Sequence, residues 1–236
     1  MQVLRIDGLT AGYGSAPIVS RISIEAGVGQ VVAIVGPNGA GKSTALKAIF
    51  GLIPRSEGSI FLDGDDVTGI PAHALARAGM AYVPQSDNVF PSMSVAENLE
   101  LGAFGDRSGL AARMAEVFDI FPELVPARTR RAGQLSGGQR NMLGMARALM
   151  SEPKVVLLDE PTAGLSPANV EVVWSQIERI SSLGTAVVVV EQNVDRALRS
   201  ANFVYILVAG MNRDSGTPAS LESLDLAEVF LGGSGR

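Results

Sequence analysis

Cysteine is absent from this chain of 236 residues, and histidine occurs once, as His73. Without cysteine there are no disulfide bonds and no thiolate-bound metals, and a single histidine argues against a histidine-based metal site. We expect His73 to have a surface or capping role, because it lies far along the chain from the motifs described below. Positive charge is also scarce, since 19 Lys and Arg stand against 24 Asp and Glu, for a net charge of −5. No nucleic-acid partner is expected, because such proteins need a basic face.

Long apolar runs are missing as well. A membrane-spanning helix needs about 18 apolar residues in succession, and the longest runs here, 186–190 and 203–209, have the length of strands. Residues 1–7 lack the charged start and the apolar stretch of a signal peptide. We therefore expect a soluble, cytoplasmic chain with enough apolar residues, 47%, to build a core. Any role at a membrane would then depend on a partner.

The most informative segment is 36–44, Gly-Pro-Asn-Gly-Ala-Gly-Lys-Ser-Thr, which fits the phosphate-binding pattern G-x-x-x-x-G-K-[ST] in full. A strand is predicted before it, at 30–35, and a helix after it, at 44–50, and this context disfavours an ordinary glycine-rich turn. Glycines let backbone N–H groups face an anion, and the helix N-terminus adds partial positive charge. Lys42 would place its charge on the outer phosphates, and the Ser43 hydroxyl would ligate Mg²⁺. The residues expected to contact the nucleotide are Asn38, Gly39, Ala40, Gly41, Lys42, Ser43 and Thr44.

A second candidate is the apolar run 155–158, which ends in Asp159 and Glu160. A doubly wound sheet binds ligands at the carboxyl ends of its strands, so both acids are expected beside the glycine-rich loop. There Asp159 would hold Mg²⁺ through water, and Glu160 would orient or deprotonate the water that attacks the γ-phosphate. Without the loop, a solvated turn would explain the two acids equally well.

Strands and helices alternate along most of the chain, which predicts an α/β fold with a mainly parallel sheet covered on both faces. Strand-like runs disappear between about 87 and 140, where helical spacing predicts a helical insert. We expect a single domain divided as follows: an antiparallel β-subdomain at 1–30 and 55–70, a nucleotide-binding core at 31–54, 71–86 and 141–225, a helical subdomain at 87–140, and a flexible tail at 232–236. The other expected helices are 72–78, 95–103, 110–118, 138–150, 168–182 and 194–200, and the other expected strands are 80–84, 185–190 and 203–208.

The string Leu-Ser-Gly-Gly-Gln at 135–139 opens one of these helices. A serine and two glycines at a helix N-terminus form another anion-binding nest, although capping by Ser136 would by itself be the simpler interpretation. In this order, the loop 36–44, Gln85, this pentapeptide and the pair Asp159 and Glu160 resemble the ATP-binding cassette (ABC) transporter ATPases. The resemblance covers essentially the whole chain and implies a P-loop NTPase fold that binds ATP and Mg²⁺ and hydrolyses ATP.

The same resemblance implies several partners at the cytoplasmic face of the cell membrane. The cassette would pair head to tail with a second cassette, identical or not, and ATP binding would close the pair while hydrolysis reopens it. Two permease subunits would be moved by this cycle and a binding protein would act indirectly. Permease docking is expected at about 85–100, with Val89, Phe90 and Met93 either making apolar contacts there or filling the core of the insert. The residues expected to contact ATP across the dimer are Ser136, Gly137, Gly138 and Gln139.

Further positions take their roles from the resemblance. Tyr13 matches the aromatic residue that stacks on adenine, with a plain core or surface tyrosine as the alternative. Gln85 matches the glutamine that touches Mg²⁺ and the attacking water, with a capped strand end as the alternative. Two departures stand out: Ser166 replaces an aspartate, which puts cross-dimer contacts there in doubt, and Gln192 replaces a histidine. The Gln192 amide donates a hydrogen bond but carries no charge. The catalytic residues implied are Lys42, Gln85, Glu160 and Gln192, and the Mg²⁺ residues are Ser43, Gln85 and, through water, Asp159.

The departure at Gln192 favours one subfamily. Together with 88–99, 164–167 and the ending 231–233, it resembles one ATPase of the branched-chain amino acid importers. Urea and amide importers have much the same pattern. A lipopolysaccharide-type exporter shares most of it too, but would be expected to keep histidine at this position. A cassette protein acting on DNA or ribosomes is disfavoured by the single cassette, the lack of sustained heptads and the acidic balance.

Overall fold

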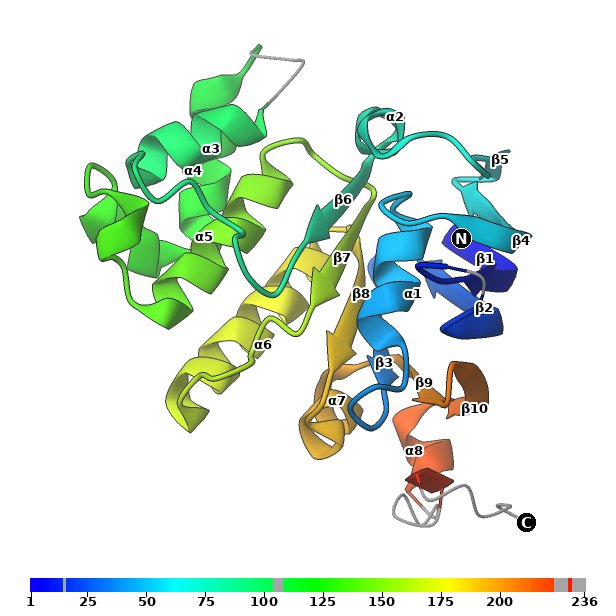
Figure 1. Ribbon diagram of the computed structural model, residues 1–236. Helices are drawn as coiled ribbons and strands as arrows, with labels where there is room; N and C mark the ends of the chain where they lie inside the picture. The colour runs from blue at the N-terminus through cyan, green and yellow to red at the C-terminus, as the bar shows by residue number, and fades with distance from the viewer. Residues whose placement is uncertain (15, 104–107, 223–228, 231–236) are drawn as a thin grey trace.

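The computed structural model describes residues 1–14, 16–103, 108–222 and 229–230. Figure 1 shows a central sheet with a second, smaller sheet on one side and a group of helices on the other. In chain order the elements are β1 (Gln2–Ala11), β2 (Val19–Gly27), β3 (Val31–Val35), α1 (Lys42–Ile49), β4 (Arg55–Leu62), β5 (Asp65–Asp66), α2 (Ala72–Ala78), β6 (Met80–Val83), α3 (Val95–Gly102), α4 (Leu110–Ile120), the 3-10 helices η1 (Pro122–Ala127) and η2 (Ala132–Gln134), α5 (Gly137–Leu149), β7 (Val155–Asp159), α6 (Pro167–Ser182), β8 (Ala186–Glu191), α7 (Val194–Ser200), β9 (Phe203–Val208), β10 (Met211–Gly216) and α8 (Pro218–Leu221).

The central sheet has six strands in the order β10-β9-β3-β8-β7-β6, and all neighbours are parallel except β10 and β9. The strands β3, β7 and β8 are buried along their whole length, as expected when helices cover both faces. Successive side chains serve different cores: Val32 and Ile34 pack with α1 and the smaller sheet, while Ala33 and Val35 pack with the helices of the opposite face. The predicted α/β architecture is therefore confirmed.

The smaller sheet is antiparallel, with the order β2-β1-β4-β5. Alternate residues of its strands, among them Leu4, Ile6, Ile22 and Ile24, are fully buried against the central sheet. It therefore consists of the segments in which an antiparallel sheet was expected.

Helix α5 continues the helical region across position 140, as the helix expected at 138–150 does, and packs against α3, α4 and β6. It therefore belongs both to the helical region and to the cover of the central sheet. The elements β10, α8, η1 and η2 were not predicted, and α1 begins two residues before the expected helix. The predicted tail, 232–236, lies outside the described residues.

Candidate functional site

The glycine-rich loop joins β3 to α1 and has a backbone that only glycine accommodates at two points. Gly36 has φ 156° and Gly41 has φ 94°. A Cβ atom on Gly36 would lie 2.0 Å from the Leu207 carbonyl oxygen, and one on Gly41 would lie 2.8 Å from a methyl group of Val19. The loop and the first turn of α1 line a cavity of about 460 Å³, and Glu160 closes one side of it. The structure thus brings the first two sequence motifs to one cavity.

Lys42 places its ammonium group inside this loop. The side chain is 4% exposed, and Nζ donates hydrogen bonds to the carbonyl oxygens of Gly36 at 2.8 Å and Pro37 at 3.1 Å. Burial lowers the pKa of Lys42 from its ordinary value, while the nearby carboxylates of Glu160 and Asp159 act in the opposite direction. The ammonium therefore lies between backbone carbonyls and acids, beside a cavity suited to an anion.

Asp159 ends β7 and is held by two hydroxyl groups. Ser43 Oγ donates to its Oδ1 at 2.6 Å, and the Tyr82 hydroxyl donates to its Oδ2 at 3.1 Å. Burial, and next the charge of Asp159, raise the pKa of Tyr82, so the phenol stays protonated. Tyr82 was not predicted as a site residue; the structure brings it to Asp159 because β6 pairs with β7 in the sheet.

Glu160 follows β7 directly and has a left-handed backbone, φ 49°, which is strained for a residue other than glycine. Its N–H donates to the Val190 carbonyl at 3.0 Å, which holds the turn in place. The side chain is 8% exposed, and its Oε2 accepts hydrogen bonds from Gln85 Nε2 at 3.0 Å and Gln192 Nε2 at 2.7 Å. Three predicted residues, each following a different strand, thus meet at one carboxylate.

Glu191 lies beneath this group and was not predicted as a site residue. It is 3% exposed and accepts a hydrogen bond from Thr162 Oγ1 at 2.7 Å. Burial raises the pKa of Glu191 to about 7, although hydrogen bonds from Thr162 and the Gln192 N–H oppose this shift. The acid connects the segment after Glu160 to the segment that carries Gln192.

The pentapeptide at 135–139 forms the start of α5 with a capping box. Ser136 Oγ accepts from the Gln139 N–H, and Gln139 Oε1 accepts from the Ser136 N–H, both at 3.2 Å. Within one subunit Ser136 therefore caps α5, which is the simpler of the two interpretations given above. Ser136 and Gly137 are exposed and remain accessible to a partner, whereas Gly138 is buried against Asn169.

The remaining predicted positions lie at the surface. Tyr13 is 60% exposed, which fits a surface tyrosine and leaves its ring free for stacking, and rules out the core alternative. Ser166 is exposed before the first turn of α6, where its side chain makes no capping hydrogen bond. The roles of both residues stay predictions.

The site offers oxygen donors of the kind that Mg²⁺ prefers. The Ser43 hydroxyl and an Asp159 carboxylate oxygen lie 2.6 Å apart at the mouth of the loop. Within the described ranges no group of three or more His, Cys, Asp or Glu side chains could hold an ion by itself. A carboxylate and a hydroxyl are oxygen ligands that Mg²⁺ typically combines with water and nucleotide phosphates.

The sequence profile of the ABC transporter family matches residues 19–163. The chain belongs to the ABC transporter family. The match begins at β2 and ends just after Glu160, so it covers the loop, the pentapeptide and both acids. The cassette is therefore an ABC ATPase subunit, and the predicted family, fold and ATPase activity are confirmed.

Several curated proteins are similar to this cassette over nearly its full length. A probable branched-chain amino acid transport ATP-binding protein, LivF of Archaeoglobus fulgidus, is 42% identical over 93% of the chain and 94% of its own length. The high-affinity branched-chain amino acid transport ATP-binding protein BraG of Pseudomonas aeruginosa is 37% identical, covering 98% and 100%. The lipopolysaccharide export system ATP-binding protein LptB of Escherichia coli K12 is 34% identical, covering 98% of each.

Solved structures agree with the fold. An ATP-binding cassette of an ABC transporter superposes with a TM-score of 0.88 at 25% identity, and an ADP conformation of such a cassette gives 0.84 at 26%, each covering 98% of the chain and 99% of the other. A dimeric bacterial cassette gives 0.80 at 24% identity over 91% and 98%. In the described part of the cassette, no helix has the length and apolar character needed to cross a bilayer.

Proposed function

We propose that this ABC ATPase powers a membrane importer for branched-chain amino acids, working at the cytoplasmic face with a second cassette and two permeases. The observation that carries the choice of cargo is the similarity to LivF and BraG, at 42% and 37% identity over nearly the whole chain. The exporter protein LptB is less similar, at 34%. Glutamine at position 192 supports the importer, since an exporter is expected to have histidine there.

Binding of the triphosphate is assigned to the loop and to Lys42. The Lys42 ammonium donates to two loop carbonyls. When ATP binds, it would turn to the β- and γ-phosphates, because a charged phosphate attracts the ammonium more strongly than a neutral carbonyl does. Ser43 and Asp159 would hold Mg²⁺, which neutralises charge on the phosphates when bound. The exposed Tyr13 ring would stack on the adenine.

Water activation is assigned to Glu160. Its Oε2 is fixed by the amides of Gln85 and Gln192, so the carboxylate has one orientation toward the cavity. Glu160 would accept the proton of the water that attacks the γ-phosphate in line, and Gln85 would help to orient that water. Gln192 would donate to the phosphate without adding charge, so transition-state stabilisation by this residue should be weaker than that by an imidazolium.

The second half of each site is assigned to a partner cassette. Figure 1 places the start of α5 on the helical side of the molecule, apart from the loop before α1, so one subunit does not close over its own loop. Ser136 and Gly137 are exposed there, at a helix N-terminus that favours anions. A head-to-tail partner would bring its own serine and glycines to the γ-phosphate.

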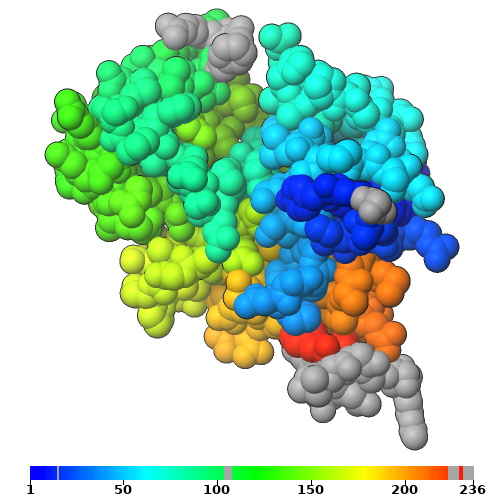
Figure 2. All heavy atoms as spheres, in the orientation of Figure 1, coloured from blue at the N-terminus to red at the C-terminus, as the bar shows by residue number. Residues whose placement is uncertain are grey.

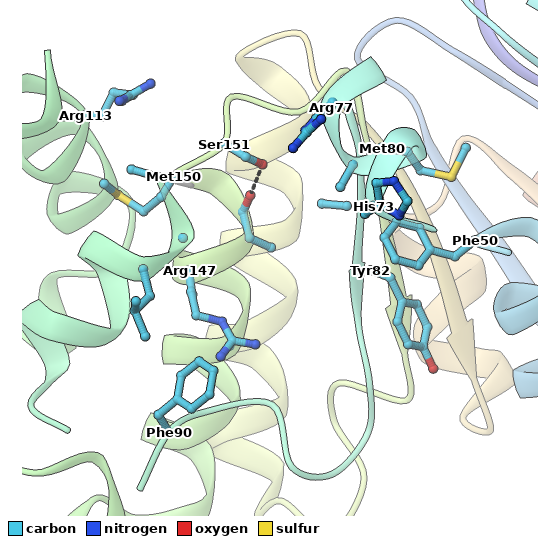
Figure 3. A pocket seen from close by; sticks show the side chains of 17 residues that line it. Phe50, His73, Arg77, Met80, Tyr82, Phe90, Arg113, Arg147, Met150 and Ser151 are labelled. Carbon is cyan, nitrogen blue, oxygen red and sulfur yellow. Dashed lines mark hydrogen bonds between the residues drawn. The ribbon is translucent and has the colours of Figure 1, made fainter. Parts of the chain in front are cut away.

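Permease docking is assigned to a groove between the two halves of the molecule. The groove has a volume of about 850 Å³ and is seen in Figure 2 as the hollow between the green helices and the cyan segment that contains α2. In Figure 3, Phe90 and Arg147 lie on one side and His73, Phe50 and Tyr82 on the other.

The composition of this groove indicates its occupant. Its described lining is mainly apolar and contains no acid, and besides Arg113, which pairs with Glu152 at 3.0 Å, it includes Arg77, Arg147 and His73, in a chain of net charge −5. Phe90 is 46% exposed, with the Arg147 guanidinium 5.0 Å from its ring centre. Asn98 fixes Phe90 by accepting from its N–H at 2.8 Å and donating to its carbonyl at 3.1 Å. Val89, by contrast, packs against the core. We assign the groove to an apolar permease segment with an acidic residue.

The intact complex tests this proposal. The cassette would be purified with its co-expressed membrane partners, and mass spectrometry would identify the subunits. The complex would then be reconstituted in vesicles with the binding protein. We expect two permeases, a second cassette, and ATP-dependent uptake of labelled leucine that a matched Glu160→Gln complex lacks. Uptake of urea without leucine, or extraction of lipopolysaccharide, would contradict the proposed cargo.

A further inference from the structure

Tyr82 belongs to two sites at once. Its ring lines the groove assigned to the permease, where Figure 3 shows it beside Phe50 with the hydroxyl directed away from the groove. That hydroxyl donates to Asp159 Oδ2 at 3.1 Å, inside the nucleotide site. One half-buried side chain thus spans the wall between the docking groove and the carboxylate assigned to Mg²⁺.

The ring of Tyr82 is also connected to the nucleotide loop through Phe50 and helix α1. Phe50 caps the C-terminus of α1 and stacks on Tyr82, with ring centres 5.6 Å apart and planes at 28°. At the other end of α1, Ser43 Oγ donates to Asp159 Oδ1 at 2.6 Å. Both oxygens of Asp159 are therefore tied to one unit, Oδ2 through Tyr82 and Oδ1 through the first turn of α1.

We propose that Tyr82 is a positioning residue that couples occupation of the groove to the orientation of the Asp159 carboxylate. The proposal rests on permease docking in this groove. A segment pressed against Phe50 and Tyr82 displaces the phenol, and the carboxylate follows because its Oδ2 has a hydroxyl partner that moves with the ring. The affinity of the site for the divalent cation then depends on whether the groove is filled.

This connection is separate from the one through Gln85. Gln85 lies three residues further along the same segment and contacts Glu160, the proposed base. Tyr82 contacts Asp159 and does not take part in proton transfer. The two contacts therefore predict different defects: loss of Gln85 impairs the chemical step as well as cation binding, whereas loss of the Tyr82 hydroxyl weakens cation binding and the response to the permease and spares the chemical step at saturating Mg²⁺.

The variant Tyr82→Phe removes the hydroxyl and keeps the ring and its stacking on Phe50. The matched control is Tyr205→Phe, another half-buried tyrosine, which packs against Phe203 with the ring planes tilted by 54° and whose hydroxyl accepts from the Glu25 N–H. Both proteins would be compared with the parent by thermal unfolding. A loss of stability in Tyr82→Phe alone does not account for the two changes described next, because both are measured on folded protein.

The first readout is binding of Mn²⁺, as a spectroscopic substitute for Mg²⁺, to the isolated subunit with a non-hydrolysable ATP analogue, followed by electron paramagnetic resonance. Removing the hydrogen-bond partner of a direct metal ligand typically weakens affinity by about 10- to 100-fold, and because Asp159 acts through water we expect the lower end, about tenfold, for Tyr82→Phe. Tyr205→Phe should match the parent. Equal affinity in Tyr82→Phe and the parent would overturn the proposal.

The second readout is the ratio of ATPase rates with and without the permeases, measured at saturating ATP over a range of free Mg²⁺. In Tyr82→Phe we expect a raised KM for Mg²⁺ and a stimulation ratio that falls toward one. An unchanged ratio would refute the coupling. If the parent itself shows no response to the permeases, the docking assignment fails, whereas the Mn²⁺ experiment still decides the contact between Tyr82 and Asp159.

Discussion

Replacing Gln192 by histidine is expected to raise kcat about fivefold at pH 6 and by less at pH 8. In the structure the Gln192 amide already reaches the catalytic centre, since its Nε2 lies 2.7 Å from Glu160 Oε2. A histidine side chain at this place would lie next to the same carboxylate and the same phosphate. The substitution changes the charge of the hydrogen-bond donor, and it makes the rate depend on whether the imidazole is protonated.

The size of the effect follows from the energies of the two donors. A neutral hydrogen bond contributes roughly 1 kcal/mol and one with a charged partner roughly 1.5–3 kcal/mol, so an imidazolium gains about 1 kcal/mol over the amide. Since 1.36 kcal/mol corresponds to a factor of ten, about 1 kcal/mol gives about fivefold in kcat. The gain requires the protonated ring, which is populated below a pH of about 6.5, and should therefore fade as the pH rises.

The assay is phosphate release at saturating ATP from the purified complex at pH 6, 7 and 8. Gln2→His, which introduces a histidine at the exposed start of β1, controls for the added titrating group. Gln192→Ala should lose about fivefold in kcat at every pH, because it removes a neutral donor. A Gln192→His rate that equals or falls below that of the parent at all three pH values would refute the reasoning.

Three further predictions concern the acids and the lysine. Glu160→Gln should keep ATP binding and accumulate an ATP-bound dimer on gel filtration, with kcat reduced at least about 100-fold, and a parental rate would exclude Glu160 as the base. Lys42→Ala should abolish detectable binding of a fluorescent ATP analogue, whereas unchanged affinity and turnover would contradict the nucleotide site itself. The pKa of Glu191 is raised to about 7 in the folded chain, so its contribution to stability is complete below about pH 4.5 and is lost as the pH rises through 7. Urea titrations should show the free energy of unfolding of the parent, relative to that of Glu191→Gln, falling by about 3 kcal/mol over that window; a constant difference between the two proteins would contradict the burial argument.

Much of the fold could be predicted because the sequence patterns are local. The four valines of β8 and the apolar run of β7 predict buried strands, and the predicted bounds of α2, α7 and β9 agree with the structure. The strand β10 was missed because Met211–Gly216 is mostly polar, and it becomes a strand only through its pairing with β9. Helix α5 begins one residue before the expected helix 138–150, because Ser136 caps it.

In the candidate site, too, residues within local motifs could be predicted, whereas residues that depend on tertiary contacts could not. Residues within motifs, such as Lys42 and Glu160, were found from the sequence, and the structure places them together, while their roles remain predictions. Tyr82 was missed because its contact with Asp159 depends on how β6 lies beside β7 and on the direction of the ring. Glu191 was missed because its burial depends on the contact with Thr162, 29 residues away in the chain, which no local pattern reveals.

Helix α5 has a mechanical consequence. Its thirteen residues form a rod about 20 Å long, with Ser136 capping one end and Gly144, Arg147 and Ala148 lining the groove near the other. A rod this short moves as one rigid body, so in the proposed complex the face that docks the permease and the serine offered to the neighbouring cassette would shift together.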